Sequence, residues 1–206
     1  MSSSVAGVNV SRETIADLEA FSQLATKWTP KINLIARGTI GDIWDRHIID
    51  SVQIYRFAPE SYDTWVDIGS GGGFPGIVMA ILGKALQPAA RFVLIESDQR
   101  KATFLRTAAR ELELPVDVIA ERIESAPQQA ADVVSARALA ALSGLLPLVQ
   151  RHLKTDGLAL LHKGRQARQE VADAQKNWSF DLEDHVSITD PESRILAIRR
   201  IKTLGA

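Results

Sequence analysis

The chain has 206 residues, 46% of them hydrophobic, and 24 basic against 25 acidic residues give a net charge of −1. A chain of this length can bury one full hydrophobic core, so we expect a single compact unit. The absence of cysteine excludes disulfides, cysteine nucleophiles, zinc thiolate sites and iron–sulfur clusters, and we expect no metal site. An RNA partner would have to be held by a local basic patch and not by an overall positive field.

The first ten residues, MSSSVAGVNV, lack the basic start and the apolar core of a signal peptide. No stretch of the sequence approaches the length of a membrane span. We therefore expect a cytoplasmic protein that has no membrane partner. A monomer is the default expectation, although nothing in the sequence determines the oligomeric state.

The first 60 residues are expected to be helical. Apolar residues recur every three or four positions from residue 11 to residue 28, with Ser11 as N-cap and Pro30 just past the end. A second helix is expected to begin at a capping box in residues 39–42, and its apolar stripe consists of Trp44, Ile48, Val52 and Tyr55. We interpret residues 1–60 as an N-terminal helical extension and residues 61–206 as the main domain.

After residue 60, short apolar runs alternate with helical periods. Strands are expected at residues 65–68, 91–96, 116–120, 132–135 and 158–161, with two more strand-like segments near the C-terminus. The helices between them are expected at residues 75–82, after Asp98, at 139–153 and after 161. This alternation predicts an α/β fold with a mostly parallel, doubly wound sheet that binds ligands at the carboxyl ends of its strands.

The most informative segment is residues 66–76, Val-Asp-Ile-Gly-Ser-Gly-Gly-Gly-Phe-Pro-Gly, which joins the first expected strand of this sheet to its helix. Glycine permits positive φ angles and close approach of the backbone to a ligand. Pro75 suits a first helical turn, where its missing N–H would be unpaired anyway. The spacing of Gly71, Gly73 and Gly76 matches a dinucleotide fingerprint, which alone is a weak signal.

Two acidic residues help to distinguish the possible ligands of this loop. Asp67 ends the first strand, where a carboxylate would repel a pyrophosphate but attract the cationic amino and sulfonium groups of S-adenosylmethionine. Glu96 ends the second strand and could accept hydrogen bonds from both ribose hydroxyls of either cofactor class. In the alternative without a ligand, Asp67 interacts with the dipole of the following helix and Glu96 is a solvated strand end.

Six segments carry a resemblance to a known family: residues 28–34, 46–51, 67–76, 121–124, 135–138 and 162–164. In this order and spacing they resemble the bacterial 16S rRNA guanine-N7 methyltransferases, formerly called glucose-inhibited division protein B. The resemblance covers the chain from about Trp28 to Gly164. The last forty or so residues contribute little to it.

The resemblance implies a class I S-adenosylmethionine methyltransferase fold with an N-terminal helical extension. It also implies transfer of a methyl group to N7 of guanine 527 in the decoding-region loop of 16S rRNA, either naked or in a small-subunit precursor. By matching motifs, the resemblance places Gly69 and Phe74 in the cofactor loop, Ile123 and Glu124 near the adenine, and Arg137 at the site from the fourth strand. Together with the residues already argued from the glycine loop and the strand ends, the expected cofactor-binding set is Asp67, Gly69, Gly71, Gly73, Phe74, Glu96, Ile123, Glu124 and Arg137.

Guanine N7 has an in-plane lone pair and no proton, so its methylation needs alignment and electrostatics but no general base. Methylation at carbon-5 of a pyrimidine would require a cysteine, and enzymes for exocyclic amines usually carry Asn-Pro-Pro-aromatic where this chain has Ser-Ala-Arg-Ala at 135–138. We expect Arg137 to act by positioning, through guanine O6, an RNA phosphate or the cofactor carboxylate. The alternative is a structural salt bridge with an acid such as Glu124.

Several basic residues could contact RNA phosphates, although such charges are usually only a solvated face. The RNA-binding candidates are Arg122, Lys163, Arg100, Lys101, Lys27 and Lys31. For Lys163 a solvated strand end is an equal alternative. His47 and Asp50, three apart on one expected helix, are interpreted as a structural pair.

Two other functions remain open at this stage. A NAD-dependent oxidoreductase would share the glycine loop and Glu96, but both tyrosines, Tyr55 and Tyr62, precede the loop, so no Tyr-x-x-x-Lys pair follows it. A non-catalytic RNA-binding module could retain an unused nucleoside-binding fold. Calorimetry with S-adenosylmethionine and with NAD would separate all three hypotheses.

Overall fold

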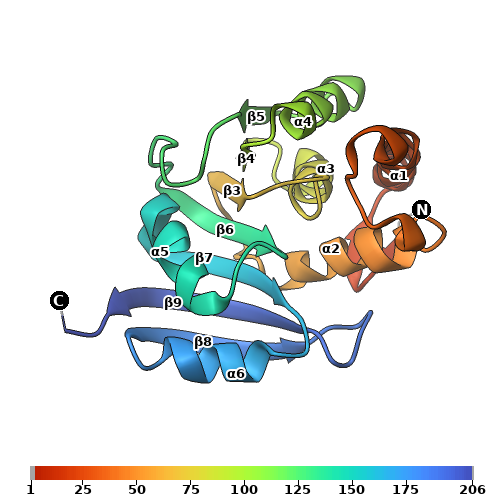
Figure 1. Ribbon diagram of the computed structural model, residues 1–206. Coiled ribbons are helices and arrows are strands. Elements are labelled where there is room, and N and C mark those ends of the chain that lie inside the picture. The colour runs from red at the N-terminus through yellow and green to blue at the C-terminus, as the bar shows by residue number, and fades with distance from the viewer. Residues whose placement is uncertain (1–2, 206) are drawn as a thin grey trace.

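The computed structural model describes residues 3–205 and contains a central sheet of strand order β5-β4-β3-β6-β7-β9-β8 (Figure 1). These strands are β3 (Thr64–Ile68), β4 (Arg91–Ile95), β5 (Val116–Ile119), β6 (Ala131–Arg137), β7 (Leu153–Lys163), β8 (Trp178–Val186) and β9 (Arg194–Thr203). Every strand expected from the sequence is present, with boundaries that differ by a few residues.

The first five strands of the sheet are parallel, and β9 is antiparallel to both β7 and β8. Because β3 pairs with β4 on one side and with β6 on the other, the chain reverses its direction of winding at β3. This is the switch point of a doubly wound sheet, where the loops after neighbouring strands diverge and leave room for a ligand. The predicted α/β class is therefore confirmed.

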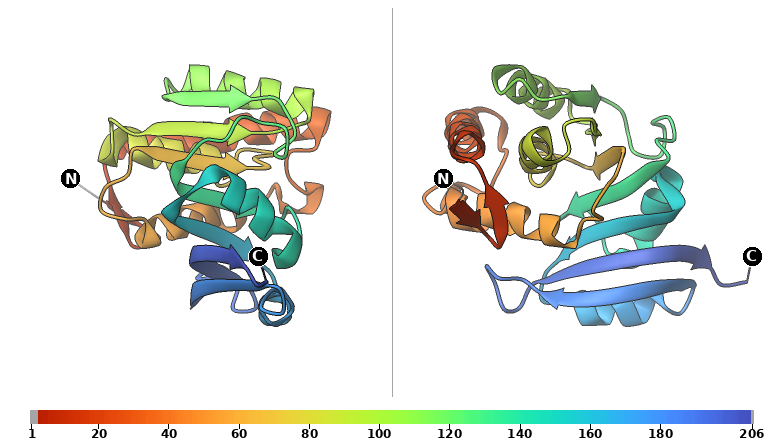
Figure 2. Two further views of the ribbon diagram at one scale, coloured as in Figure 1. Left: turned by 90° about the vertical axis from the view of Figure 1, so that its left-hand side faces the viewer. Right: turned by 180° about the vertical axis from the view of Figure 1, so that it is seen from behind.

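Helices cover both faces of the sheet, as the two further views show (Figure 2). The helices of the main domain are α3 (Gly76–Leu86), α4 (Gln99–Glu111), α5 (Leu142–His152) and α6 (Ala167–Ala174). The parallel strands are apolar on both faces, and two hydrophobic clusters result. Trp65 of β3 belongs to the cluster with α3 and α4, whereas Val66 belongs to the cluster with α5.

The N-terminal region begins with an antiparallel hairpin of β1 (Ser3–Val5) and β2 (Val8–Val10), which the purely helical prediction had not included. Helix α1 (Arg12–Ile32) follows, and the Ser11 side chain caps it by accepting a hydrogen bond from the Thr14 N–H at 3.2 Å, as predicted. Its buried side chains share one hydrophobic cluster with β3 and β4. A unit boundary at residue 60 stays a prediction.

Two details of the helical prediction were wrong. Pro30 lies inside α1 and not beyond it, because its missing N–H costs a single hydrogen bond near the end of the helix, which closes at Asn33 through the Thr29 carbonyl. Thr39 does not open a capping box. Its hydroxyl donates to the Ala36 carbonyl at 2.8 Å and lies 2.9 Å from Nε2 of His47.

The segment that follows Thr39 is a helix of mixed type. It comprises the 3₁₀ turn η1 (Arg37–Thr39), the π-helical η2 (Trp44–Ile49), one α-turn, α2 (Asp50–Val52), and the 3₁₀ turn η3 (Gln53–Phe57). Ile48 and Val52 of the expected apolar stripe are fully buried. Within residues 3–205, no helix has the length and apolar character needed to cross a membrane.

The fold makes a direct prediction about two helical glycines. A Cβ added at Gly83 in α3 would collide with the ring of Phe92, whereas one added at Gly144 in α5 would meet nothing within 4 Å. We expect Gly83→Ala to lower the free energy of unfolding by about 1–3 kcal/mol through overpacking. Gly144→Ala should raise it by up to about 1 kcal/mol, because alanine is the better helix former. Urea denaturation of both variants measures this, and equal effects would contradict the packing described.

Candidate active site

Two adjoining cavities open at the carboxyl ends of the parallel strands. The glycine-loop cavity, of about 540 Å³, is bounded by the loop after β3, the end of β4 and residues 122–124. The second cavity, of about 550 Å³, is bounded by the ends of β6 and β7, by α6 and by residues before β9. Arg137, Ala138, Leu139 and Ala140 border both cavities and form their common wall.

The loop after β3 owes its shape to glycines and to backbone hydrogen bonds. Gly69, Gly71 and Gly73 all have positive φ angles, which other residues rarely adopt. The Gly69 N–H donates to the Ile95 carbonyl at 2.9 Å, which ties the loop to β4. Gly69 and Gly71 line the glycine-loop cavity, whereas Gly73 does not, and the cofactor contacts expected of all three stay predictions.

Glu96 lies at the floor of the glycine-loop cavity, 8% exposed. Its Oε2 accepts from the Gly71 N–H at 2.8 Å, and its Oε1 accepts from the Asp98 N–H at 2.7 Å. Because a carboxylate has about four acceptor positions, both oxygens keep capacity for a ligand hydroxyl. The position of Glu96 therefore fits the ribose contact expected of it, and Glu96 also holds the loop in shape.

Asp67 is fully buried beneath the loop and does not line the cavity. Its Oδ1 accepts from the Ser135 hydroxyl at 2.6 Å, and its Oδ2 has no hydrogen-bond partner among the described residues. A Cβ at Gly76 would come within 2.7 Å of Oδ2, so only glycine leaves room for the carboxylate. Burial raises the pKa of Asp67 to about 6, against the opposing effects of Ser135 and Arg137. Any effect of Asp67 on a cationic ligand would thus act through the loop, without direct contact.

The opposite side of the glycine-loop cavity carries the residues expected near an adenine. Ile123 is buried and Glu124 is exposed, and both line the cavity together with Arg122 and Lys101. Glu124 forms its ion pair with Arg122 at 3.2 Å. The suggested salt bridge between Glu124 and Arg137 is therefore wrong.

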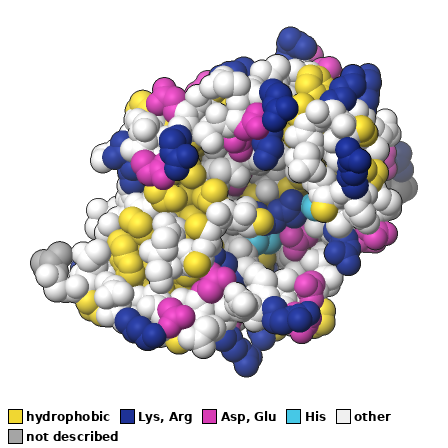
Figure 3. Space-filling model, viewed as in Figure 1, with side chains coloured by type: hydrophobic (Ala, Val, Ile, Leu, Met, Phe, Trp, Pro, Cys, Tyr) yellow, Lys and Arg dark blue, Asp and Glu magenta, His cyan; other side chains and the backbone are white. Residues whose placement is uncertain are grey.

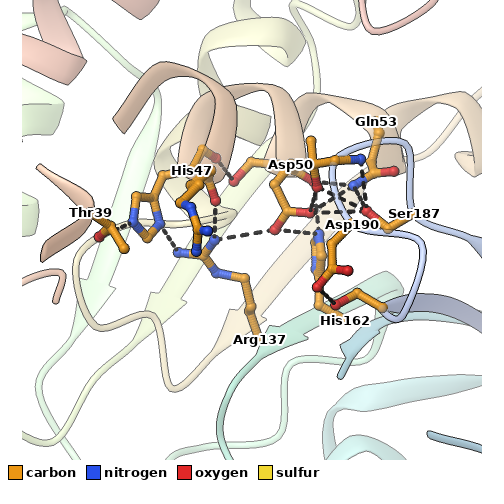
Figure 4. A network of polar contacts seen from close by, with 12 residues as sticks. Thr39, His47, Asp50, Gln53, Arg137, His162, Ser187 and Asp190 are labelled. Carbon is orange, nitrogen blue, oxygen red and sulfur yellow. Dashed lines mark hydrogen bonds and ion pairs between the residues drawn. The ribbon is translucent and has the colours of Figure 1, made fainter. Parts of the chain in front are cut away.

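Arg137 makes its ion pair with Asp50 of the N-terminal region instead (Figure 4). Its Nη1 lies 3.3 Å from Asp50 Oδ2, its Nη2 lies 2.9 Å from His47 Nδ1, and its guanidinium carbon is 5.4 Å from the centre of the Phe74 ring. Phe74 also lines the glycine-loop cavity. The guanidinium is thus fixed on three sides at the common wall of the two cavities.

The hydrogen bonds define the tautomer of His47. Because arginine only donates, Nδ1 of His47 must accept from Arg137, and the ring proton is on Nε2, facing the Thr39 hydroxyl at 2.9 Å. Burial and the neighbouring Arg137 charge lower the pKa of His47 to about 4. His47 is consequently neutral near pH 7. The sequence suggested that His47 and Asp50 form a pair with each other. In the structure each of them binds Arg137 instead.

Asp50 is the functional residue that sequence reasoning undervalued. Its Oδ1 accepts from Gln53 Nε2 at 2.7 Å and from the Thr189 hydroxyl at 2.8 Å, while its backbone carbonyl faces His162 Nε2 at 2.8 Å. It therefore connects the N-terminal region with the end of β7 and with the loop before β9. The sequence signal that could have identified Asp50 is Gln53, a hydrogen-bonding partner three residues further along the same helical face.

Lys163 ends β7 in the second cavity and is only 7% exposed. Its Nζ donates to the Ala140 carbonyl at 2.5 Å and to Glu170 Oε2 at 2.8 Å. Lys163 is therefore not a solvated strand end, and its role in RNA binding stays a prediction.

The remaining basic candidates lie away from the cavities. Arg100 is exposed and pairs with Asp98 at 3.5 Å, and Lys27 and Lys31 are exposed on α1. On the face seen in Figure 3, basic side chains occur at separate places with acidic ones between them, and histidine is visible in the central hollow. A role in RNA binding for any of these residues stays a prediction.

The buried Asp67 carboxylate should leave a pH signature. Because its pKa in the folded protein is about 6, above the ordinary value of 3.8, the folded state holds the proton more tightly than the unfolded state. Its contribution to stability is fully present below about pH 4 and is lost as the pH rises through about 6, on the order of 3 kcal/mol. Urea denaturation without ligand should show this fall in the wild type and in the exposed control Glu111→Gln. A fall of equal size in Asp67→Asn would contradict it.

The Arg137–Asp50 pair should show strong coupling in a double-mutant cycle. Removing either partner leaves a nearly buried charge uncompensated, so Arg137→Ala or Asp50→Ala should each cost about 3–5 kcal/mol. The double variant should lose less than the sum of the two. The exposed pair Arg122 and Glu124 is the matched control, with coupling of about 0.2–1 kcal/mol. Coupling no larger than that of the control would rule out the pair as a structural anchor.

Comparison with solved structures finds a similar fold in proteins of low sequence identity. The M. jannaschii protein TYW2 in complex with AdoMet superposes with a TM-score of 0.59 at 14% identity, covering 85% of this chain and 80% of that one. A methyltransferase from Geobacter sulfurreducens superposes with a TM-score of 0.57 at 15% identity, covering 93% and 90%. The class I methyltransferase fold predicted from the sequence is thereby confirmed.

Comparison of sequences identifies the family. The ribosomal RNA small subunit methyltransferase G of Ruegeria pomeroyi is 49% identical over 191 residues, covering 93% of both chains. The protein of the same name from Cereibacter sphaeroides is 51% identical over 192 residues, covering 93% of this chain and 92% of that one. The family described as GidB, rRNA small subunit methyltransferase G, matches residues 14–197. The chain therefore belongs to the rRNA small subunit methyltransferase G family.

Proposed function

We propose that this protein transfers a methyl group from S-adenosylmethionine to N7 of guanine 527 in 16S rRNA. The observation that carries the proposal is the pair of adjoining cavities with a common wall at Arg137 to Ala140. A nucleoside cofactor in one and a base in the other would meet at this wall. The names of the family and of its relatives supply the rRNA of the small subunit as the substrate class.

The residues of the glycine-loop cavity fit S-adenosylmethionine. Glu96 suits the ribose hydroxyls, Ile123 offers an apolar surface for the adenine, and the positive φ angles at Gly69 and Gly71 let the backbone approach the ligand closely. The cofactor supplies an electrophilic methyl group on a positively charged sulfur. No phosphate has to be accommodated above the buried Asp67 carboxylate.

The residues at the common wall suit a reaction that transfers no proton. The guanidinium of Arg137 is occupied by Asp50 and His47, and neutral His47 already uses Nδ1 as an acceptor and Nε2 as a donor. Each of these three groups is thus engaged with partners inside the fold. Guanine N7 requires no general base, so the work left to the protein is alignment of base and methyl group and exclusion of water.

The NAD-dependent alternative is not favoured. A dinucleotide-binding sheet of strand order 3-2-1-4-5-6 carries a sixth strand beside the fifth, whereas here the antiparallel β9 is inserted between β7 and β8. A non-catalytic RNA-binding module would not need the glycine-loop cavity or the buried carboxylates of Glu96 and Asp67 that shape it. For contacts to the RNA backbone we propose Lys101 and Arg122, which line the glycine-loop cavity.

The proposed reaction has a specific chemical test. Small-subunit particles and naked 16S rRNA from cells that lack the methyl group are incubated with the protein and S-adenosylmethionine. N7-methylguanine has a fixed positive charge, so the product strand should be cleaved at one guanine by borohydride and aniline. Gly71→Val should abolish both cleavage and cofactor binding by calorimetry, because a side chain there meets only the Gly69 carbonyl at 3.8 Å and would enter the cavity. Methylation at an exocyclic nitrogen or at ribose would refute the N7 assignment and leave the cofactor assignment intact.

A further inference from the structure

The second cavity contains a buried ion pair that takes no part in lining the glycine-loop cavity, where the cofactor is proposed to bind. Lys163 enters from the end of β7 and Glu170 from the first turns of α6. The two charges are 2.8 Å apart, and their side chains are 6% and 21% exposed. A pair so far removed from solvent has lost most of its hydration, which is costly unless other hydrogen bonds replace it.

The pair is held firmly by the backbone around it. Lys163 donates to the Ala140 carbonyl at 2.5 Å, and Glu170 Oε2 also accepts from the Leu142 N–H at 2.8 Å. Both contacts are to the segment that runs from the common wall into α5. The geometry of the pair is therefore coupled to the position of the wall between the two cavities.

Each partner nevertheless keeps unused hydrogen-bonding capacity. Within residues 3–205, Glu170 Oε1 forms no hydrogen bond, and the Lys163 ammonium uses two of its three protons. A donor and a strong acceptor are thus available side by side on the lining of the second cavity.

We propose that the second cavity receives the target guanine, with Glu170 Oε1 accepting from its N1–H and 2-amino groups and Lys163 Nζ donating to its O6. This inference rests on the proposed function and extends it from the cofactor to the recognition of the base. It makes Glu170 and Lys163 specificity-determining residues.

The donor–acceptor order suits guanine and opposes adenine. On its Watson–Crick edge guanine presents the acceptor O6 beside the donors N1–H and 2-amino, which is complementary to an ammonium beside a carboxylate. Adenine presents a donor amino group beside the acceptor N1. Its amino group would face the Lys163 ammonium, donor against donor, and its N1 would face the Glu170 carboxylate, acceptor against acceptor. Bases taken out of the stack are commonly recognised through this edge.

The orientation also agrees with the chemistry. With its Watson–Crick edge on Lys163 and Glu170, guanine keeps its N7 edge free to face the common wall and the glycine-loop cavity beyond it. N7 is adjacent to O6 around the ring and remote from the 2-amino group. Recognition and reaction therefore use different edges of the same base.

The experiment uses small-subunit particles reconstituted with 16S rRNA that carries either guanine or inosine at the target position. Inosine keeps O6, N1–H and N7 and lacks only the 2-amino group. The wild-type protein should methylate the guanine particle about 10- to 100-fold faster in kcat/KM, the range for one hydrogen bond to a charged group. Equal rates on guanine and inosine in the wild type would overturn the proposal without any variant.

The variant Glu170→Gln supplies the second arm. It should lower kcat/KM on guanine and reduce the preference for guanine over inosine toward one, and because this preference is a ratio within one variant, a change in S-adenosylmethionine affinity does not affect it. Asp173→Asn is the matched control, because Asp173 lies on the same helix and pairs with the exposed Lys176 at 2.6 Å. Its preference for guanine should equal that of the wild type.

The outcomes separate this inference from the proposed function. If the wild type produces no N7-methylguanine on the guanine particle, the proposed function itself is wrong. If it does so, and Glu170→Gln keeps the full preference for guanine over inosine, the second cavity is not the guanine site and the ion pair serves only to hold the wall.

Discussion

The structure of the site depends on the ion pair between Arg137 and Asp50, two side chains that are far apart in the sequence and in contact in the fold. Arg137 ends a central strand and Asp50 belongs to the N-terminal helical segment, and both are largely removed from solvent. Because each charge is unfavourable without the other, the pair fixes the N-terminal region against the sheet. The common wall of the two cavities is placed by this contact, and His47 and Phe74 complete the enclosure of the guanidinium.

A second constraint is the burial of negative charge beneath the glycine loop. The Asp67 carboxylate requires glycine at position 76, because any side chain there would occupy the space of Oδ2. The loop above is held by Glu96 through the Gly71 N–H, so two carboxylates shape a segment that has almost no side chains of its own. The sharp backbone turns and the open cavity are consequences of the same glycines.

The sequence predicts the parts of the fold that are determined locally. Strand positions follow from apolar runs, the start of α1 from Ser11 and the start of α4 from Asp98. It does not predict the insertion of β9 between β7 and β8, nor the binding of Arg137 by Asp50 rather than Glu124, because both depend on contacts between distant segments. Lys163 illustrates the limit: a strand-end lysine is usually solvated, and only the folded chain shows its burial.

The position of β9 bears on the order in which the molecule can assemble during its synthesis. This strand follows every other strand of the sheet in sequence, yet it lies inside the sheet, between β7 and β8. While a ribosome is still translating β9, β7 has an unpaired edge and β8 has no neighbour in the sheet. The loop just before β9 carries Ser187 and Thr189, which bind Asp50. A nascent chain therefore holds all residues of its glycine loop well before the last strand that encloses its second cavity has been made.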